Sequence, residues 1–369
     1  MSIFKVPLTT VKSVFPHPNA DRLSIAVVYG FNIVVGKDQY EAGDLCIFVS
    51  PDSLLPLDLE VKLFGPESKI KLNKGRVKQI KIRGAYSQGM LIKPNMVLDV
   101  NYQLETDLAE VLKITKYEPG PAAFQGSNTS VRKRDKPKEN PFFHKYGGID
   151  NFKWYPELFA EGEEVSVTEK IHGSNIRFGL VPYVANNLWR KLLKKLGLAP
   201  QYEWVYGSNN VQLQQRCGYK GFYGEDVYGK VLAKYNAKDK VKPGEIWYGE
   251  LYGDGIQKGY TYGCTNGEHK LVVFDMKLQD GVDAKYIDAE YFFNLAHARG
   301  FETCPEVYRG PYNANIKLFT QGDSVLVPAQ KVREGVVLKT LKETNSIIGR
   351  KLLKLISEKY LESDQTDFH

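Results

Sequence analysis

The composition of the chain changes abruptly at residues 118–141, "EPGPAAFQGSNTSVRKRDKPKENP". This stretch has little apolar periodicity and is rich in Pro, Gly, Ser and cations, which is typical of a linker or an exposed loop. The 369-residue chain is long enough for two or three domains. We therefore predict a first domain over residues 1–95, a connecting segment over 96–141 and a second domain over 142–369. The cations of the segment could follow a phosphate backbone, and a solvated linker explains them equally well. They are Arg132, Lys133, Arg134, Lys136 and Lys138.

Short β-like runs fill the first 95 residues, among them "SIAVVYG", "FNIVVG", "LCIFVS" and "VKQIKIRG". Each run is apolar or β-branched and ends near Gly, Pro or Ser, which predicts several short strands. Strands at this spacing favour a small all-β barrel or sandwich. An edge sheet of one larger domain is the alternative.

Bulk properties exclude several classes of protein. The chain is 43% hydrophobic and 25% charged with a net charge of +7, which permits a polyanionic partner without establishing one. Cys46, Cys217, Cys264 and Cys304 form no C-x-x-C pair, which argues against a zinc ribbon or a disulfide scaffold and fits a reducing cytosol. No apolar run approaches the roughly 20 residues of a membrane span, and the N-terminus lacks a secretory signal. We expect a cytoplasmic or otherwise intracellular, soluble protein with no membrane partner.

Strand and helix patterns mix from residue 142 onward, which predicts an α+β domain with antiparallel sheets and flanking helices. Helices are expected at 186–198 and 288–300, the second ending at Gly300. The first carries a leucine stripe that we expect to pack on a domain core, with its cations in water; contact with nucleic acid is the alternative. The stripe is Leu188, Leu192, Leu193 and Leu196, and the cations are Arg190, Lys191, Lys194 and Lys195.

Common catalytic motifs are missing from the sequence. It has no P-loop, no strand-linked G-x-G-x-x-G, no H-E-x-x-H and no G-x-S-x-G. Instead, charged residues stand at the edges of five apolar runs: "TEKIHGSN", "IWYGELYG", "LVVFDMK", "REGVVLKT" and "GRKLLKLIS". Each run alone is weak evidence, but together they supply a complete set of groups for phosphoryl chemistry.

Gathered in one cleft, these groups could transfer a nucleotide. A lysine is ordinarily protonated at pH 7, since its pKa is about 10.4. Cations around Lys170, together with a divalent metal ion, would favour its neutral, nucleophilic form. Glu250 and Glu334 could hold that ion, and Phe274 could stack on a purine. The cations are Lys339, Lys351 and Lys354.

In order and spacing, the five runs resemble the motifs of the covalent nucleotidyltransferase superfamily of polynucleotide ligases and mRNA capping enzymes. The resemblance covers most of residues 142–357, and "KIHG" has the form typical of RNA ligases. It implies Lys170 as the adenylated residue, Glu250 at the ribose, Phe274 on the adenine and Glu334 in metal organisation. It implies Lys339 and Lys354 at the α-phosphate. Further nucleotide contacts are implied for Glu169, Ile171, His172, Asn175 and Asp275.

Two departures from the pattern concern cations. The closing motif of relatives usually reads Lys-x-Lys, whereas "KLLK" separates Lys351 from Lys354 by three positions. Relatives often carry Arg where Asn209 stands, so Arg216 or another cation would have to replace it, or the enzyme manages without one.

The first domain resembles OB-type tRNA-binding modules through "FPHPNADRLSIAVVYG", "VVGKDQYEAGDLCIFVSPDSLLP" and "KIRGAYSQGML". An OB barrel before a ligase domain is the arrangement of one nick-sealing RNA ligase family. The resemblance implies that the OB face grips the RNA backbone, with Lys78, Lys81 and Arg83 as candidates; an exposed strand explains them nearly as well.

The implied activity is ATP-dependent sealing of 3′-hydroxyl and 5′-phosphate RNA ends, with Mg²⁺ or Mn²⁺ and a lysyl-AMP intermediate. The expected partner is RNA or a nicked RNA/DNA duplex, and the expected state is a monomer. The alternatives are a capping guanylyltransferase or DNA ligase, whose OB domain normally follows the nucleotidyl domain, and an inactive RNA-binding relative.

Overall fold

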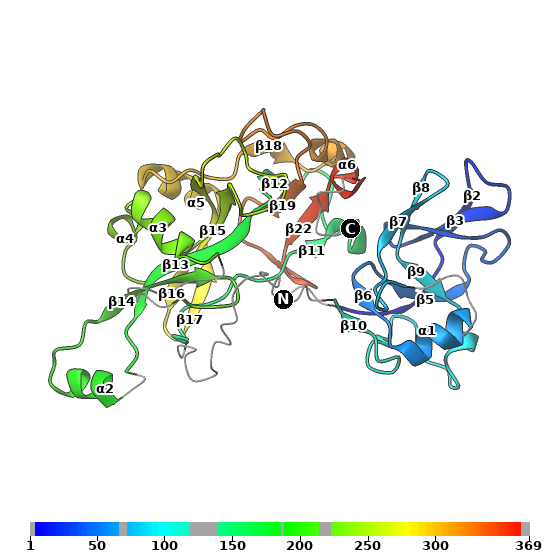
Figure 1. The fold of residues 1–369 in the computed structure, drawn as a ribbon, viewed down its shortest axis with the longest axis horizontal. Helices are drawn as coiled ribbons and strands as arrows, with labels where there is room; N and C mark the ends of the chain where they lie inside the picture. Colours follow the sequence, from blue (N-terminus) through cyan, green and yellow to red (C-terminus); the bar gives the residue numbers. More distant parts are fainter. Residues whose placement is uncertain (1–3, 66–71, 118–138, 186–187, 214–222, 363–369) are drawn as a thin grey trace. The chain divides into compact units, whose positions relative to one another are not determined.

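The computed structural model describes residues 4–65, 72–117, 139–185, 188–213 and 223–362 (Figure 1). The basic cluster at 132–138, Arg216 and Cys217 lie outside these residues. Two compact units are present: one holds residues up to 127 together with 150–158, and the other holds most of the remainder. Each is described by itself.

The first unit is built from short antiparallel strands. One sheet has the order β1-β5-β9 and another the order β2-β3-β4, while β7 and β8 form a hairpin. Buried and more exposed residues alternate along β3 and β4, as expected for strands with one face on a core. The strands are β1 (Leu8–Thr10), β2 (Ser13–Pro16), β3 (Leu23–Val28), β4 (Phe31–Gly36), β5 (Leu45–Val49), β6 (Ser53–Leu54), β7 (Gln79–Ile82), β8 (Ala85–Gln88), β9 (Met90–Ile92) and β10 (Thr115–Lys116), with one helix, α1 (Leu57–Phe64).

Residues 150–158 return to this unit, through β11 (Asp150–Asn151) and the 3₁₀ turn η3 (Phe152–Trp154). The backbone N–H of Gly30 donates to the carbonyl of Lys153 over 2.8 Å. A Cβ at Gly30 would lie 3.0 Å from that backbone, so the close approach favours glycine. The ring of Trp154 lies 5.2 Å from those of Phe31 and Phe48.

The second unit has two antiparallel sheets. The first contains the strands in the order β22-β19-β12-β18, and the second has the order β14-β13-β15-β16-β17. Their bounds are β12 (Glu164–Lys170), β13 (Ser174–Pro182), β14 (Tyr202–Ser208), β15 (Glu245–Gly253), β16 (His269–Asp280), β17 (Asp283–Tyr286), β18 (Glu306–Pro311), β19 (Gly335–Thr340) and β22 (Leu352–Ile356). A small hairpin is formed by β20 (Asn345–Ser346) and β21 (Gly349–Arg350).

Helices cover one face of the second sheet, as Figure 1 shows. They are α3 (Val227–Lys234), α4 (Ala237–Lys240) and α5 (Ala289–Ala298). Their apolar residues share a core with Phe178, Trp247 and Val273 from the strands. The neighbouring residues Ile246 and Tyr248 point to the other face and pack with Leu352 of the first sheet. The site lies on this second face. The unit also contains η4 (Ala314–Thr320) and α6 (Glu358–Glu362).

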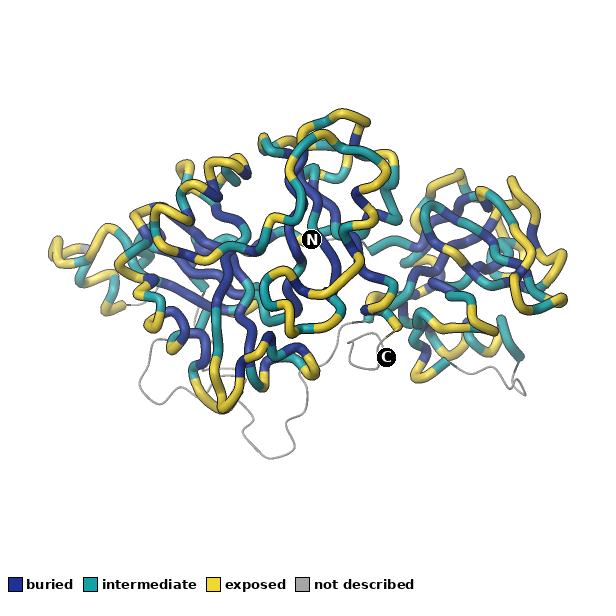
Figure 2. Tube along the Cα trace, turned by 90° about the horizontal axis from the view of Figure 1, so that it is seen from above, coloured by how far each residue is buried: buried dark blue, intermediate teal, exposed yellow. Residues whose placement is uncertain are grey.

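The expected helix at 288–300 is present as α5, followed by Gly300 with φ of 64°. The helix expected at 186–198 is present as α2 (Leu188–Lys195), but the prediction that its leucine stripe packs on a core is wrong. Leu188, Leu192 and Leu196 are all exposed. The helix lies at the left of Figure 2, as in Figure 1, and none of its described residues is buried.

Two further expectations concern bulk properties. Among the described residues, no helix is both long and apolar enough to cross a membrane. Cys46, Cys264 and Cys304 are buried free thiols.

Candidate active site

Lys170 is the last residue of β12, and a tight turn separates it from β13. A Cβ at Gly173 would come within 2.3 Å of the Leu251 carbonyl, so only glycine lets the turn approach β15 this closely. The pairing of β12 with β19 sets Lys170 opposite Gly335 and thereby brings Glu334 beside it. The Lys170 Nζ lies 2.6 Å from Glu334 Oε1, and the lysine side chain is 27% exposed.

The charge environment of Lys170 differs from the one expected. Burial lowers the pKa of its amine, but the negative charges of Glu334 and Glu250 outweigh burial and raise that pKa above its ordinary value. Lys170 is therefore a protonated member of an ion pair in the free protein. We expected lysines together with a divalent metal ion to favour the neutral amine; the lysines alone do not do so, because carboxylates and not cations are its closest charged neighbours.

Glu250 lies on β15 opposite Asn175 of β13. Burial raises the pKa of Glu250 to about 8, against the lowering effect of Lys170, and Glu334 raises it further. The pKa of Glu334 is also raised by burial, but Lys170 and His172 reverse this and leave it below its ordinary value. The pKa values of the two carboxyl groups beside Lys170 are thus driven apart. Near pH 7, Glu334 is ionised and Glu250 is protonated.

His172 does not line the cavity but lies beneath Glu334. Its Nδ1 is 3.5 Å from Glu334 Oε2, and its backbone N–H donates to the hydroxyl of Tyr262 over 2.8 Å. The rings of Tyr260 and Tyr360 meet it edge to face. This packing fixes the turn that follows Lys170.

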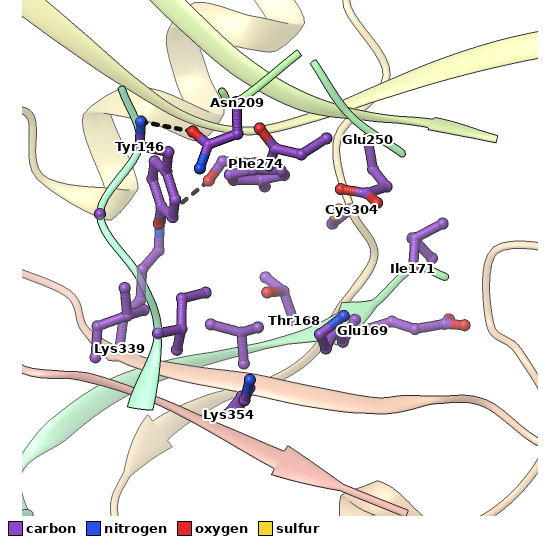
Figure 3. Close-up of a pocket in the computed structure, with 16 residues that line it drawn as sticks. Tyr146, Thr168, Glu169, Ile171, Asn209, Glu250, Phe274, Cys304, Lys339 and Lys354 are labelled. Atoms are coloured by element: carbon purple, nitrogen blue, oxygen red, sulfur yellow. Dashed lines mark hydrogen bonds between the residues drawn. The ribbon is translucent and has the colours of Figure 1, made fainter. Parts of the chain in front are cut away.

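Lys170 lines a cavity of about 280 Å³. Figure 3 shows how other lining residues, among them Glu250, Phe274 and Lys354, are arranged around it. Eight of the predicted site residues line it: Glu169, Lys170, Ile171, Asn175, Glu250, Phe274, Lys339 and Lys354. The first sheet contributes pairs two positions apart, such as Val337 with Lys339 and Leu352 with Lys354. Alternate side chains of a strand share a face, so this spacing explains the set.

The two lysines of the last sequence motif, Lys351 and Lys354, have different surroundings. Lys354 lies on β22 and lines the cavity, whereas Lys351, the residue before β22, does not line it and binds Glu163 at 2.6 Å. Lys339 is buried, with its Nζ 3.4 Å from the Phe274 carbonyl and 5.3 Å from the centre of the Phe292 ring.

Phe274 reaches the cavity through a β-bulge. The pairing of β15 with β16 shifts between Tyr248 and Gly249, so that Phe274 is the extra residue on β16. Val273 before it packs with the helices, whereas Phe274 packs on the other side of the sheet. Gly249 permits this, because a Cβ there would lie 2.5 Å from the Val272 carbonyl.

Asp275 is fully buried and does not line the cavity. Arg350 binds its Oδ2 at 2.9 Å and Tyr146 donates to the same oxygen at 3.0 Å. Burial raises the pKa of this carboxyl, but Arg350 and Lys339 outweigh burial and lower it. The guanidinium of Arg350 also stacks on Tyr286 at 3.4 Å, so this network connects the strands behind the cavity.

Several cavity residues were missed from the sequence. Tyr146 meets the ring of Phe274 edge to face at 5.1 Å, and its backbone N–H donates to Asn209 Oδ1 at 3.0 Å. It lies in "HKYGGID", outside any recognisable motif. Burial strongly raises the pKa of the Cys304 thiol and so disfavours its thiolate form. The others are Gly147, Ile149, Thr168, Val337 and Leu352.

The site offers oxygen atoms as ligands for a metal ion. Glu334 Oε2, Glu169 Oε1 and Asn175 Oδ1 are buried and accept no hydrogen bond from the described residues. No cluster of three or more His, Cys, Asp or Glu suited to a metal occurs in the described part of the chain. The site thus fits a hard cation that keeps waters and phosphate oxygens among its ligands, as Mg²⁺ and Mn²⁺ do.

The candidate RNA contacts of the first unit lie around the β7–β8 hairpin. Lys81 is exposed on β7, with its Nζ 5.2 Å from the Tyr86 ring centre. Arg83 is exposed at the turn with φ of 48°, and Lys78 is half-buried before β7.

Comparison with known families now places the chain. A model of an OB-fold domain matches residues 6–94, and a model of the RNA ligase family matches residues 163–356, more than half of the chain. The chain belongs to the RNA ligase family. The predicted class of enzyme and the predicted fold class, an all-β OB-type domain before an α+β nucleotidyltransferase domain, are confirmed.

Solved structures of a Naegleria gruberi RNA ligase share the fold of this RNA ligase. The structure with PPi is 19% identical with a TM-score of 0.73, over 98% of each chain. Variants of that protein were solved with ATP and Mn (20% identity, TM-score 0.71, 97% of this chain and 98% of that one) and with AMP and Mn (18%, 0.73, the same coverage). No curated protein matches in sequence.

Proposed function

We propose that this protein is an ATP-dependent RNA ligase that seals 3′-hydroxyl and 5′-phosphate ends in nicked duplexes through a lysyl-AMP at Lys170. The observation that carries the proposal is the position of Lys170. Its amine lies at the mouth of a cavity that holds two carboxyl groups, two further lysines and an aromatic ring. The ATP and Mn complexes of the Naegleria gruberi ligase support ATP as the donor.

In the first step, the Lys170 amine loses a proton and attacks the α-phosphorus of ATP. A nitrogen–phosphorus bond forms, the bond to the bridging oxygen breaks, and pyrophosphate leaves with its electron pair. Glu334 is hydrogen-bonded to the amine and can accept the proton. Lys339 and Lys354 line the same cavity and stabilise the negative charge on the α-phosphate.

The carboxylates of Glu250 and Glu334 are the groups that would hold Mg²⁺ or Mn²⁺, whose charge stabilises phosphate oxygens and disfavours the protonated amine. Phe274 presents its ring to the adenine, and Asn175 and Ile171 border the nucleotide. Glu169 is held by the backbone N–H groups of Val325 and Leu326 and keeps one oxygen for the ligand.

The AMP then passes to the 5′-phosphate of the RNA, which displaces Lys170 from phosphorus. The 3′-hydroxyl attacks the activated 5′-phosphate, a phosphodiester bond forms, and AMP leaves. Lys78, Lys81 and Arg83 of the OB-type domain are proposed to hold the RNA on the 3′-hydroxyl side. The domain limits 1–95, 96–141 and 142–369 and the monomeric state remain part of this proposal.

A sealing assay with nicked duplexes tests the proposal. The wild-type protein should join the nick with ATP and Mg²⁺, and Lys170→Ala should not. Lys170→Ala should still seal a nick whose 5′-phosphate is already adenylated, since that substrate no longer needs the nucleophile. Failure of the wild-type protein on every nick would contradict the proposal.

The alternatives predict other results in the same assay. A capping enzyme would label itself with GTP in preference to ATP, and a DNA ligase would prefer nicks with DNA on both sides. An inactive relative would bind the nick equally well with and without Lys170→Ala, and neither the wild-type protein nor the variant would seal it.

A further inference from the structure

Helix α2 lies at the end of a β-ribbon that leads away from the active site. The ribbon is formed by β13 and β14, whose pairing runs from Ile176–Ser208 near the cavity to Pro182–Tyr202. At about 3.3 Å per residue, the far end lies about 20 Å from the near end. Figure 1 shows α2 beyond that far end, away from both sheets.

One charged residue of α2, Arg190, faces the ribbon, while Lys191 and Lys195 are exposed. Arg190 binds Glu203 at 2.6 Å, donates to the Val184 carbonyl at 2.9 Å and stacks over the ring of Tyr183 at 4.7 Å. These contacts fix the rotation of the helix about its axis. The side of α2 that contacts the ribbon therefore carries Arg190, whereas a surface helix normally packs its leucines against the protein.

The apolar side consequently faces solvent. Leu188 is 86% exposed, Trp189 66% and Leu192 45%. Leu188, Leu192 and Leu196 are four residues apart and share one face with Trp189, opposite Arg190. A contiguous exposed apolar face of this kind marks an interaction site.

The segment is also strongly basic. Residues 188–202 contain four cations and no Asp or Glu. Lys191 and Lys195 are exposed beside the leucines. The complementary surface must therefore offer apolar groups and negative charge together.

We propose that α2 docks on an anionic lipid surface, with Trp189 and the leucines in the acyl boundary and the lysines at the headgroups. Leucine and tryptophan on one face and lysine on the other are the signature of helices that lie in a membrane interface. A phosphate backbone offers nothing to the exposed leucines, and a second copy of this chain would bring like charges together.

Flotation of the full-length protein with lipid vesicles tests this proposal. Vesicles of phosphatidylcholine with about 30% phosphatidylserine should carry the protein upward, and added salt should weaken the effect. Replacing Leu188 and Leu192 by Ser should reduce binding by about tenfold or more. The matched control is Leu318→Ser, since Leu318 is 67% exposed in η4, away from α2. It should float like the wild type.

Trp189 provides a second readout. Anionic vesicles should shift the tryptophan emission to shorter wavelength, and Trp189→Phe should lose the shift while still floating. Equal flotation of the Leu188/Leu192 double variant, or no flotation at all, overturns the proposal. Loss of RNA affinity or of self-association in that variant, with no flotation of the wild type, assigns the face to RNA or to a second copy instead.

Discussion

The raised pKa of Glu250 predicts a measurable effect on stability. In the folded protein this carboxyl has a pKa of about 8, against an ordinary value of 4.5. At intermediate pH the folded state therefore holds a proton that the unfolded state has released, so the free energy of unfolding must fall as pH rises. The slope is about 1.4 kcal/mol per pH unit for one such group.

Glu250→Gln removes this dependence, because the amide is neutral at every pH. Between about pH 5.5 and 7.5, the wild-type protein should lose about 2–3 kcal/mol relative to the variant. For a unit of this size the difference corresponds to roughly 4–12 °C in the midpoint of thermal unfolding. Most other titrating groups are shared, so their contributions cancel; Lys170 and Glu334, whose charges interact with Glu250, are the exceptions.

Calorimetry of both proteins at the two pH values measures the difference. The transition of the second unit is the one that Phe292→Ala displaces, since Phe292 is fully buried in its core. Excess Mn²⁺ should stabilise the wild type at the higher pH and have little effect on Glu250→Gln. If the two proteins change in parallel with pH, Glu250 titrates normally and the reasoning from burial fails.

Four further substitutions separate the roles of residues in and around the cavity. Lys354→Ala should reduce the rate of adenylation by about 100-fold, which single-turnover labelling measures. Lys351→Ala should leave that rate nearly unchanged. It should lower the free energy of unfolding by about 1 kcal/mol through loss of its ion pair, which urea unfolding measures. Phe274→Ala should raise the half-saturating ATP concentration by about 10- to 100-fold in the same labelling assay. Glu334→Gln should lower the pKa of Lys170, because burial then acts without its counter-ion; faster modification of Lys170 by an amine-selective reagent at neutral pH is the expected result, and an unchanged rate contradicts it.

Much of the cavity could be predicted from the sequence, because charged residues at the ends of apolar strands are conspicuous. Lys170, Glu250 and Lys339 stand out in this way, and the structure brings them together. Motif spacing left the choice between Lys351 and Lys354 open, and the structure decides it, because Lys354 lines the cavity and Lys351 pairs with Glu163.

The remainder depends on tertiary contacts without a local pattern. Tyr146 lies in a loop, and its place in the cavity follows from its hydrogen bonds to Asn209 and Asp275. The charge of Lys170 depends on which neighbours lie closest, and strand register places Glu334 there. The outward leucines of α2 follow from Arg190 binding the ribbon, which helical periodicity alone does not reveal.

Mapping the covalent adduct gives the decisive measurement. The protein is incubated with ATP and Mg²⁺, digested at neutral pH and analysed by mass spectrometry for a peptide bearing AMP. The bond should be an acid-labile phosphoramidate on Lys170, and Lys170→Arg should carry none. AMP on another lysine, or sealing of nicks by Lys170→Arg with ATP, would contradict the role proposed for this amine.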